Sequence, residues 1–270
     1  MAQHKVALLG VPVDHNSSYL PGAALAPARI REAIHSDSSN MWTELGVNLG
    51  EQGVWADMGD VAVNGEDREE TSNSIRQKAI ELIKQGERVI SLGGDHSVSY
   101  PLIDAHAQNY DGLNVLHVDA HADLYGDFGG NPLSHASPFA RLMETGGVSR
   151  LLQVGIRTLN DHQREQAARF GVEIIEMKDW LDSANIGFDG PVYMSIDLDG
   201  LDPAFAPGVS HHEPGGFSSR QVIDLIHRFK GPLVGADIVE LNPHRDINNM
   251  TAMVAARLTK EIIGRLRTGA

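Results

Sequence analysis

The stretch HVDAHADLY at residues 117–125 decides how this chain folds and what it can bind. It directly follows the apolar residues 113–116, which predict a buried strand that ends at the motif. Asp119, His121 and Asp123 recur at every second position, and in an extended backbone such side chains point to the same side. Two carboxylates and an imidazole that meet at one point need a cation between them. We interpret the stretch as part of a divalent metal site.

Two further stretches repeat this arrangement of metal-ligand residues after an apolar run. Residues 195–203 read SIDLDGLDP and follow the strand-like residues 192–194, and residues 93–97 read GGDHS and follow residues 89–92. Three such clusters are hard to explain as three independent polar loops. Together they supply six candidate metal ligands: His96, Asp119, His121, Asp123, Asp197 and Asp199.

Strand-like and helix-like segments alternate along most of the chain. We expect strands at residues 6–11, 89–92, 113–118, 151–156, 172–175, 192–196 and 232–239, and one short strand within the irregular residues 36–65. We expect helices at residues 27–34, 74–84, 100–107, 139–144, 162–170, 218–229 and 251–266. Such alternation predicts a three-layer α/β/α fold with a mostly parallel central sheet, whose ligands bind outside the carboxyl ends of the strands. No repeat or linker divides the chain, so we expect a single domain over residues 1–270.

Length and composition suit one large α/β domain. The chain has 270 residues, of which 41% are hydrophobic and 21% charged, and its formal net charge is −14. The acidic balance argues against nucleic acid or an anionic membrane surface as a partner and suits a cationic substrate. Cysteine is absent, which excludes disulfides, thiolate ligands and thiol nucleophiles.

Residues 1–9 match neither a signal peptide nor a transit peptide, and no apolar run reaches the ~18 residues of a membrane span. We therefore expect a cytoplasmic protein.

Six carboxylate and imidazole ligands favour two ions over one, because carboxylates can be shared between neighbouring ions. Donors without sulfur favour Mn²⁺ over Zn²⁺ and leave Ni²⁺, Co²⁺ and Fe²⁺ open. A calcium loop that starts at Asp197 is excluded, because its sixth residue is Asp202 instead of Gly and its twelfth is Gly208 instead of Glu. Two such ions would hold a hydroxide at neutral pH.

A phosphate substrate is disfavoured, since no P-loop or Lys/Arg clamp lies near the clusters, and a cationic carbon centre fits better.

The three clusters resemble the signature motifs of the ureohydrolases, the arginase/agmatinase family. The resemblance covers nearly the whole chain and extends to residues 9–18, 134–137, 205–216, 235–243 and 250–256. It is greatest to the plant-type arginases, which are nearer to agmatinases than to animal arginases. The resemblance implies an arginase-like fold and a hydrolase with two Mn²⁺ ions per chain. Such an enzyme cleaves a guanidino group to urea and an amine by means of a metal-bridging hydroxide. The resemblance also implies a homo-oligomer, a trimer or a hexamer.

The resemblance also assigns roles to single residues. Carried over residue by residue, it implies that one ion is held by His96, Asp119, Asp123 and Asp199, and the other by His121, Asp119, Asp197 and Asp199. Asp119 and Asp199 would bridge the two ions.

Three residues would act on the substrate by the same resemblance. Asp123 would orient the hydroxide. His135 matches the family's proton-transfer histidine, and its ordinary pKa near neutrality suits that role. Glu240 matches the carboxylate that pairs with the substrate guanidinium, a cation whose fork suits a bidentate partner.

The substrate is less constrained than the reaction. Arginine differs from agmatine by an α-carboxylate, which Asn131, Asn160, His15 or Asn16 could bind. Animal arginases have Asn where this chain has Tyr125, and Ser where it has Asn131. We favour L-arginine, cleaved to urea and L-ornithine, with agmatine, cleaved to putrescine and urea, as the second candidate. Other guanidino acids and formimino-glutamate come third. A metal-binding or regulatory homologue without this activity is the alternative of another class, and the presence of every predicted ligand argues against it.

Four further histidines are expected at positions outside the set of metal ligands. We expect His117, inside a strand, to lie in the core beside the metal site. His106 lies in the middle of a helix and is expected at the surface. His211 and His212 are placed in a loop near the mouth of the site.

Overall fold

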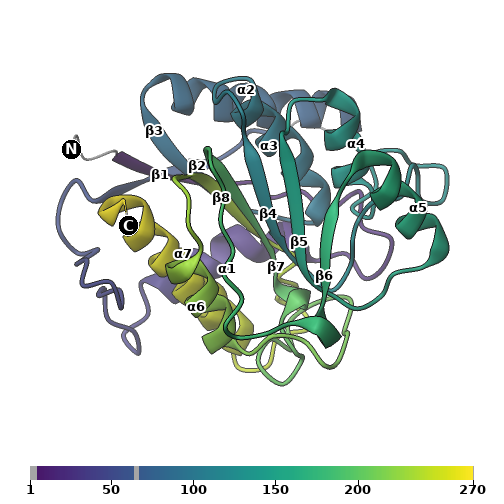
Figure 1. The fold of residues 1–270 in the computed structure, drawn as a ribbon. Helices are drawn as coiled ribbons and strands as arrows, with labels where there is room; N and C mark the ends of the chain where they lie inside the picture. Colours follow the sequence, from purple (N-terminus) through teal and green to yellow (C-terminus); the bar gives the residue numbers. More distant parts are fainter. Residues whose placement is uncertain (1–4, 64–66, 270) are drawn as a thin grey trace.

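The computed structural model describes residues 5–63 and 67–269 and contains one eight-stranded sheet with helices on both faces (Figure 1). The strands are β1 (Lys5–Gly10), β2 (Trp55–Asp60), β3 (Glu87–Leu92), β4 (Asn114–Val118), β5 (Arg150–Ile156), β6 (Glu173–Glu176), β7 (Val192–Asp197) and β8 (Leu233–Val239). The α-helices are α1 (Ala26–Ile34), α2 (Arg68–Lys84), α3 (Ser99–Ala107), α4 (Pro138–Thr145), α5 (Asp161–Phe170), α6 (Ser219–Arg228) and α7 (Met250–Thr268). Short 3₁₀ turns include η2 (His96–Val98) and η4 (Leu198–Gly200).

The sheet has the order β2-β1-β3-β8-β7-β4-β5-β6, and every neighbouring pair runs parallel. Every residue of the central strands β4, β7 and β8 is buried. Strands covered on both faces need continuous apolar runs, which is the pattern that the sequence shows there. The predicted parallel sheet is confirmed.

The helices form two layers, one on each face of the sheet. Helices α1, α6 and α7 pack on one face, and α2, α3, α4 and α5 pack on the other (Figure 1). The buried side chains that make these contacts include Ile30, Ile226 and Ile262 on the first face and Ile75, Leu102 and Leu142 on the second. The predicted three-layer α/β/α architecture is therefore confirmed.

Local signals explain the element boundaries. Helix α2 begins at Arg68 instead of residue 74, because the side chain of Asp67 accepts a hydrogen bond from Glu70 N and caps a polar first turn. Ser218 caps α6 in a reciprocal pair with Gln221. The single strand expected between residues 36 and 65 is β2, at the sheet edge. Residues 64–65 of that irregular segment, like residues 1–4, lie outside the described residues.

The surface position expected for His106 is wrong. This side chain is fully buried beneath the sheet, where Nδ1 donates to Leu102 O at 2.7 Å and the ring meets the edge of Tyr193. Gly235 on β8 makes room for it, since a Cβ at that position would lie 2.2 Å from His106 Nε2.

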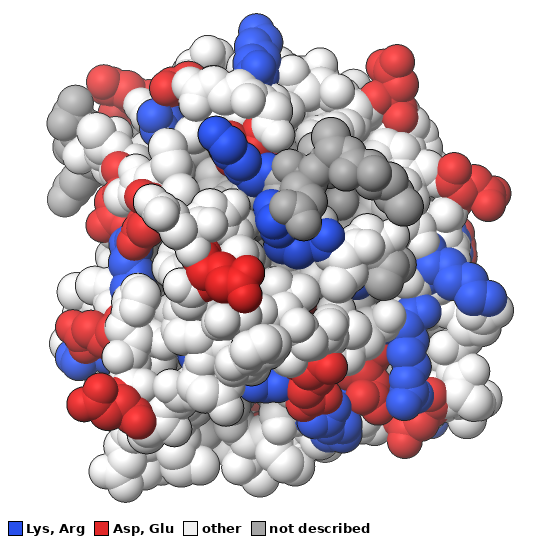
Figure 2. Space-filling view, turned by 90° about the vertical axis from the view of Figure 1, so that its left-hand side faces the viewer, with Lys and Arg blue, Asp and Glu red and all other residues white. Residues whose placement is uncertain are grey.

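Charge is mixed over the face of the molecule in Figure 2, where acidic and basic side chains of the described residues are interspersed. Among the described helices, none combines the length and apolar character that a membrane crossing requires.

Candidate metal centre and active site

The three sequence clusters meet because the strands that carry them are neighbours. Strands β3, β8, β7 and β4 are consecutive in the sheet, and parallel strands place their carboxyl ends at one edge. His96 follows β3 in η2, Asp197 ends β7, Asp199 lies in η4, and Asp119 follows β4. Residues far apart in the sequence are thus brought to one edge of the sheet by the strand order alone.

His96 lies at the centre of the first group of ligand-type atoms. Its Nδ1 is 3.1 Å from Asp119 Oδ2, 3.0 Å from Asp123 Oδ2 and 3.1 Å from Asp197 Oδ2. This nitrogen is buried and has no hydrogen-bond partner of acceptable geometry. Adjacent ligand atoms of an octahedral ion with bonds of about 2.1 Å lie about 3 Å apart. The spacing and the direction of Nδ1 therefore fit a shared cation better than direct hydrogen bonds.

A second group lies beside the first and shares Asp119 with it. His121 Nδ1 is 3.0 Å from Asp199 Oδ2 and 3.5 Å from Asp119 Oδ1. Asp119 therefore faces His96 with one oxygen and His121 with the other. Asp119, His121 and Asp199 present ligand atoms close enough to hold one ion. The carboxylate between two imidazoles is the arrangement expected of a bridging ligand.

Two carboxylates of the site, Asp197 and Asp199, are costly to ionise without a cation. Burial raises the pKa of Asp197 well above its usual value, and the neighbouring Asp199 and Asp119 raise it further. Burial also raises the pKa of Asp199 to about 6, although His121 opposes that shift. Bound divalent ions would supply the missing positive charge.

The backbone is adapted to the site in three places. Asp123 and Glu240 adopt left-handed conformations with φ of 50° and 66°, which non-glycine residues take only at a cost of about 1–2 kcal/mol. The chain after Asp119 is therefore not simply extended, yet Asp123 still reaches His96. Gly94 allows close packing before His96, since a Cβ there would lie 1.7 Å from Val13 O.

His117 supports the metal ligands from inside the core. It is fully buried as expected, and its Nε2 lies 2.8 Å from Asp119 Oδ2. Gln153 on β5 donates from Nε2 to His117 Nδ1 at 3.0 Å, which leaves the ring proton on Nε2 to be donated to Asp119. Gln153 was not predicted from the sequence. A lone amide in the otherwise apolar run of β5 was the signal that could have identified it.

Arg157 was also missed. Directly after β5, its guanidinium donates to the carbonyl oxygens of Asp199, Gly200 and Glu213, among others. It thereby ties the loop of a metal ligand to the loop of Glu213. No sequence pattern identifies such a residue, because its partners are backbone atoms.

His135 and Glu240 form a buried pair beside the metal ligands. His135 Nδ1 lies 2.8 Å from Glu240 Oε1, which also accepts from His96 N at 2.9 Å. Burial by itself would lower the pKa of His135, but Glu240 raises it to about 9. Ser18 contacts the other ring nitrogen, with Oγ 2.8 Å from His135 Nε2. The pair can hold and release a proton next to the metal cluster.

A cavity of about 260 Å³ opens onto these groups. Its lining includes four candidate ligands together with His135 and Glu240, and further residues at its rim: Ser18, Tyr125, Phe128, His211 and Glu213. The neighbouring His212 is not among the lining residues, and its Nε2 lies 2.7 Å from Pro207 O. The cavity has room for a small substrate directly beside the metal ligands.

The predicted contacts to a substrate carboxylate are not part of this lining. Asn131 donates to Asn16 Oδ1, and Asn160 caps α5 while donating to Tyr125 Oη at 2.6 Å. His15 also lies outside the residues that form the cavity wall. Asn160 contacts two residues of the cavity wall, Tyr125 and Gln163.

Comparisons with known proteins agree with this geometry. The sequence model of the Arginase family matches residues 4–264. "Arginase 1, mitochondrial" of Arabidopsis thaliana is 49% identical over 98% of this chain and 82% of its own length. The "N(1)-aminopropylagmatine ureohydrolase" of Thermus thermophilus is 38% identical over 96% of this chain and 89% of its own. The solved arginase of Medicago truncatula superposes with a TM-score of 0.92 and 44% identity, over 98% of this chain and 88% of its own.

The expectation of a cytoplasmic protein is wrong by the same comparisons. Relatives from Arabidopsis thaliana and Oryza sativa that are 49% and 47% identical are named mitochondrial or chloroplastic/mitochondrial. These names point to an organelle. The expectation rested largely on composition, and the composition of a folded domain does not encode its compartment.

Proposed function

Because this chain belongs to the arginase family of hydrolases, which act on guanidino and amidino groups, we propose that it cleaves L-arginine to urea and L-ornithine. The observation that carries the proposal is the convergence of His96 Nδ1 on three carboxylate oxygens at 3.0–3.1 Å, beside a cavity of substrate size. The proposed unit of function is one ureohydrolase domain over residues 1–270.

We propose two Mn²⁺ ions per chain, held by the six residues that meet at the sheet edge. By the distances, one ion would take His96, Asp119, Asp123 and Asp197, and the other His121, Asp119 and Asp199. Asp197 thus takes the place at the first ion that the sequence resemblance gave to Asp199. The two faces of Asp119 support this arrangement, since its oxygens lie toward His96 and His121 separately. Oxygen and imidazole donors without sulfur support manganese. Bound metal would supply a hydroxide nucleophile at neutral pH.

The chain's own residues would bind the substrate and move protons. Glu240 is placed to pair with the guanidinium, because its carboxylate is buried, lines the cavity and has its pKa lowered by His135 despite burial. Asp123 would orient the attacking group from the cavity wall. His135 would transfer a proton, since it lines the cavity and its two ring nitrogens contact different partners, Glu240 and Ser18. The products would be urea and the free amine.

Agmatine is the second candidate, and the cavity lining favours it specifically. None of the lining residues is Lys or Arg, and Glu213 stands near the mouth with its side chain 39% exposed. A substrate amine would be attracted there, whereas the α-carboxylate of arginine would find no guanidinium or ammonium partner. The similarity to an aminopropylagmatine ureohydrolase supports the same alternative.

The test is a substrate panel on manganese-loaded protein, with urea as the readout. Arginine should give the highest kcat/KM, and agmatine measured at equal concentration is the direct competitor. A higher kcat/KM for agmatine would replace arginine as the substrate, and no urea from any guanidine would overturn the proposed activity. Light scattering on the same sample tests our further proposal that the chain forms a trimer or a hexamer.

A further inference from the structure

We propose that Ser18 carries the proton of His135 between the imidazole and water outside the cavity, an inference that rests on the proposed function. Ser18 is exposed and also lines the cavity. Its hydroxyl oxygen lies 2.8 Å from His135 Nε2, and its backbone nitrogen donates to the same atom at 3.1 Å. No other residue of the cavity wall is described with a hydrogen bond to this nitrogen.

The two contacts define the neutral form of the ring, which predominates above its pKa of about 9. A backbone N–H can only donate, so His135 Nε2 must accept from Ser18. The ring proton then lies on Nδ1 and is donated to Glu240 Oε1. Each nitrogen of His135 thus has a distinct partner, the buried Glu240 on one side and the exposed Ser18 on the other.

Turnover requires a second proton on His135 to come and go. When Nε2 is protonated, it can donate to Ser18 Oγ, which accepts with a lone pair while its own hydroxyl proton passes to a water molecule. The serine ends unchanged, the imidazole is neutral again, and the water carries the proton away. The same path in reverse delivers a proton. Only O–H and N–H bonds break and form, so the step needs no other reactant.

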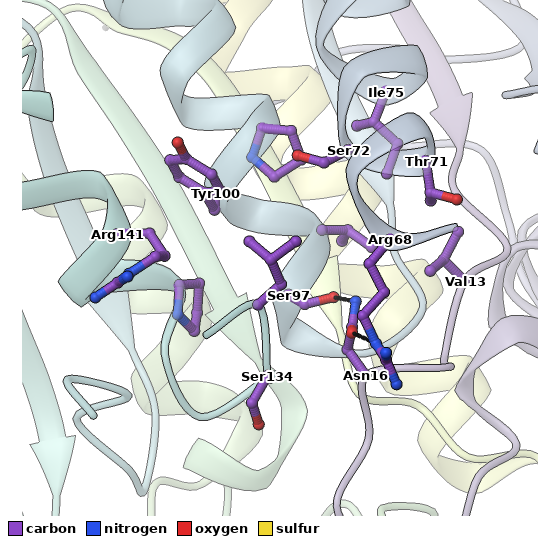
Figure 3. A pocket seen from close by; sticks show the side chains of 14 residues that line it. Val13, Asn16, Arg68, Thr71, Ser72, Ile75, Ser97, Tyr100, Ser134 and Arg141 are labelled. Carbon is purple, nitrogen blue, oxygen red and sulfur yellow. Dashed lines mark hydrogen bonds between the residues drawn. The ribbon is translucent and has the colours of Figure 1, made fainter. Parts of the chain in front are cut away.

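Ser18 is held in place by an anchored loop. Asn16, two residues before it, donates from Nδ2 to Ser97 Oγ and accepts at Oδ1 from Arg68 Nε (Figure 3). Its backbone oxygen accepts from His135 N at 3.2 Å. Because Ser97 directly follows His96, the loop is fixed relative to both the metal cluster and the proton-transfer histidine. A hydroxyl on a loose loop would not keep this alignment.

The kinetic test compares Ser18→Ala with Ser18→Thr and with Ser17→Ala. We expect Ser18→Ala to lower kcat about tenfold with KM unchanged, since loss of a proton relay costs less than loss of the acid–base group itself. Added imidazole buffer should restore much of the rate by taking the proton directly. Ser18→Thr keeps the hydroxyl and should keep the rate. Ser17 contacts Asp95 and not His135, so Ser17→Ala is the matched control and should resemble the unchanged protein.

Two results would overturn the proposal. One is a Ser18→Ala variant with unchanged kcat, and the other is a loss that imidazole does not restore. The ¹⁵N chemical shifts of the His135 ring provide a readout without turnover. Above pH 9, where the ring is neutral, we expect a protonated Nδ1 and an accepting Nε2, with the Nε2 signal shifted in Ser18→Ala. If the unchanged protein releases no urea, the proposed function fails, and the ring shifts still decide whether Ser18 binds His135.

Discussion

His96 and His106 both follow β3 and are both fully buried, yet their surroundings shift their pKa values in opposite directions. Burial by itself lowers the pKa of a histidine. At His96 three carboxylates outweigh burial and raise the pKa well above its usual value. At His106 no carboxylate is among the groups that affect the ring, and burial lowers the pKa to about 4.

The difference shows what distinguishes a candidate metal ligand from a core histidine in this fold. The carboxyl ends of the strands gather acids around His96. His106 instead contacts Leu102 of its own helix and, on the sheet, Tyr193 and Gly235. Burial is the same in both, so the chemistry depends on which groups face the ring.

We expect the largest effect on metal binding and activity when Asp119, the carboxylate that faces both His96 and His121, is removed. Asp119→Ala should abolish manganese retention, because Asp119 faces both His96 and His121. Urea production should fall by roughly three orders of magnitude or more, the scale of losing a preorganised electrostatic contact. Elemental analysis after desalting measures the metal. Asp224→Ala, on α6 far from the cluster, is the control. Unchanged metal content in Asp119→Ala would contradict the bridging role.

His135 tests whether a histidine near the cluster can act without being a ligand. His135→Ala should lower kcat by about 10²–10⁴-fold, the usual contribution of an acid–base group. Metal content should stay intact, since the described contacts of His135 are to Glu240 and Ser18. Elemental analysis and urea release on the same preparation separate the two effects. Loss of metal in this variant would make His135 a ligand.

The core environment of His106 predicts a pH effect on stability. The folded pKa of His106 is about 4, whereas the unfolded chain titrates near the ordinary value of about 6.5. Below pH 6.5 the unfolded state therefore binds a proton that the folded state refuses. Stability is lost as the pH falls from about 6.5 to 4, by roughly 3 kcal/mol for this residue.

The variant His106→Asn isolates that contribution. Asn keeps a donor for Leu102 O but does not titrate. Urea denaturation of the metal-free proteins at pH 7 and pH 4.5 should show a smaller loss of stability in the variant. Equal losses in both proteins would show that His106 is protonated in the folded state.

The two histidines also show which features of the structure could be predicted from the sequence and which could not. His96 was predictable, because it follows an apolar run and stands among ligand-type residues. His106 was not, since the space for it is left by Gly235, which lies on a strand far along the chain. Helical position alone did not reveal which face of α3 the sheet covers.

The same limit applies within the site. Apolar runs identified the parallel strands, and those strands place the six acidic and imidazole side chains at one edge. Gln153, Arg157 and Ser18 act through hydrogen bonds to partners far away in the sequence, which only the folded chain brings near. Asn131 and Asn160 were expected at the substrate, but their amides are used within the protein.

The smallest effect is expected on manganese affinity when Gln153, the core residue that supports His117 beside Asp119, is replaced. Gln153 is fully buried and donates to both His117 Nδ1 and Ala122 O. It fixes the tautomer in which His117 donates to Asp119, and such supporting contacts typically contribute 10–100-fold to metal affinity. Gln153→Leu should therefore weaken manganese binding about tenfold, while kcat at saturating manganese stays unchanged. Calorimetric titration of metal-free protein measures this. His106→Asn, a core change that touches no ligand, should leave the affinity as it is. Equal affinities in Gln153→Leu and the unchanged protein would show that His117 holds its contact to Asp119 without Gln153.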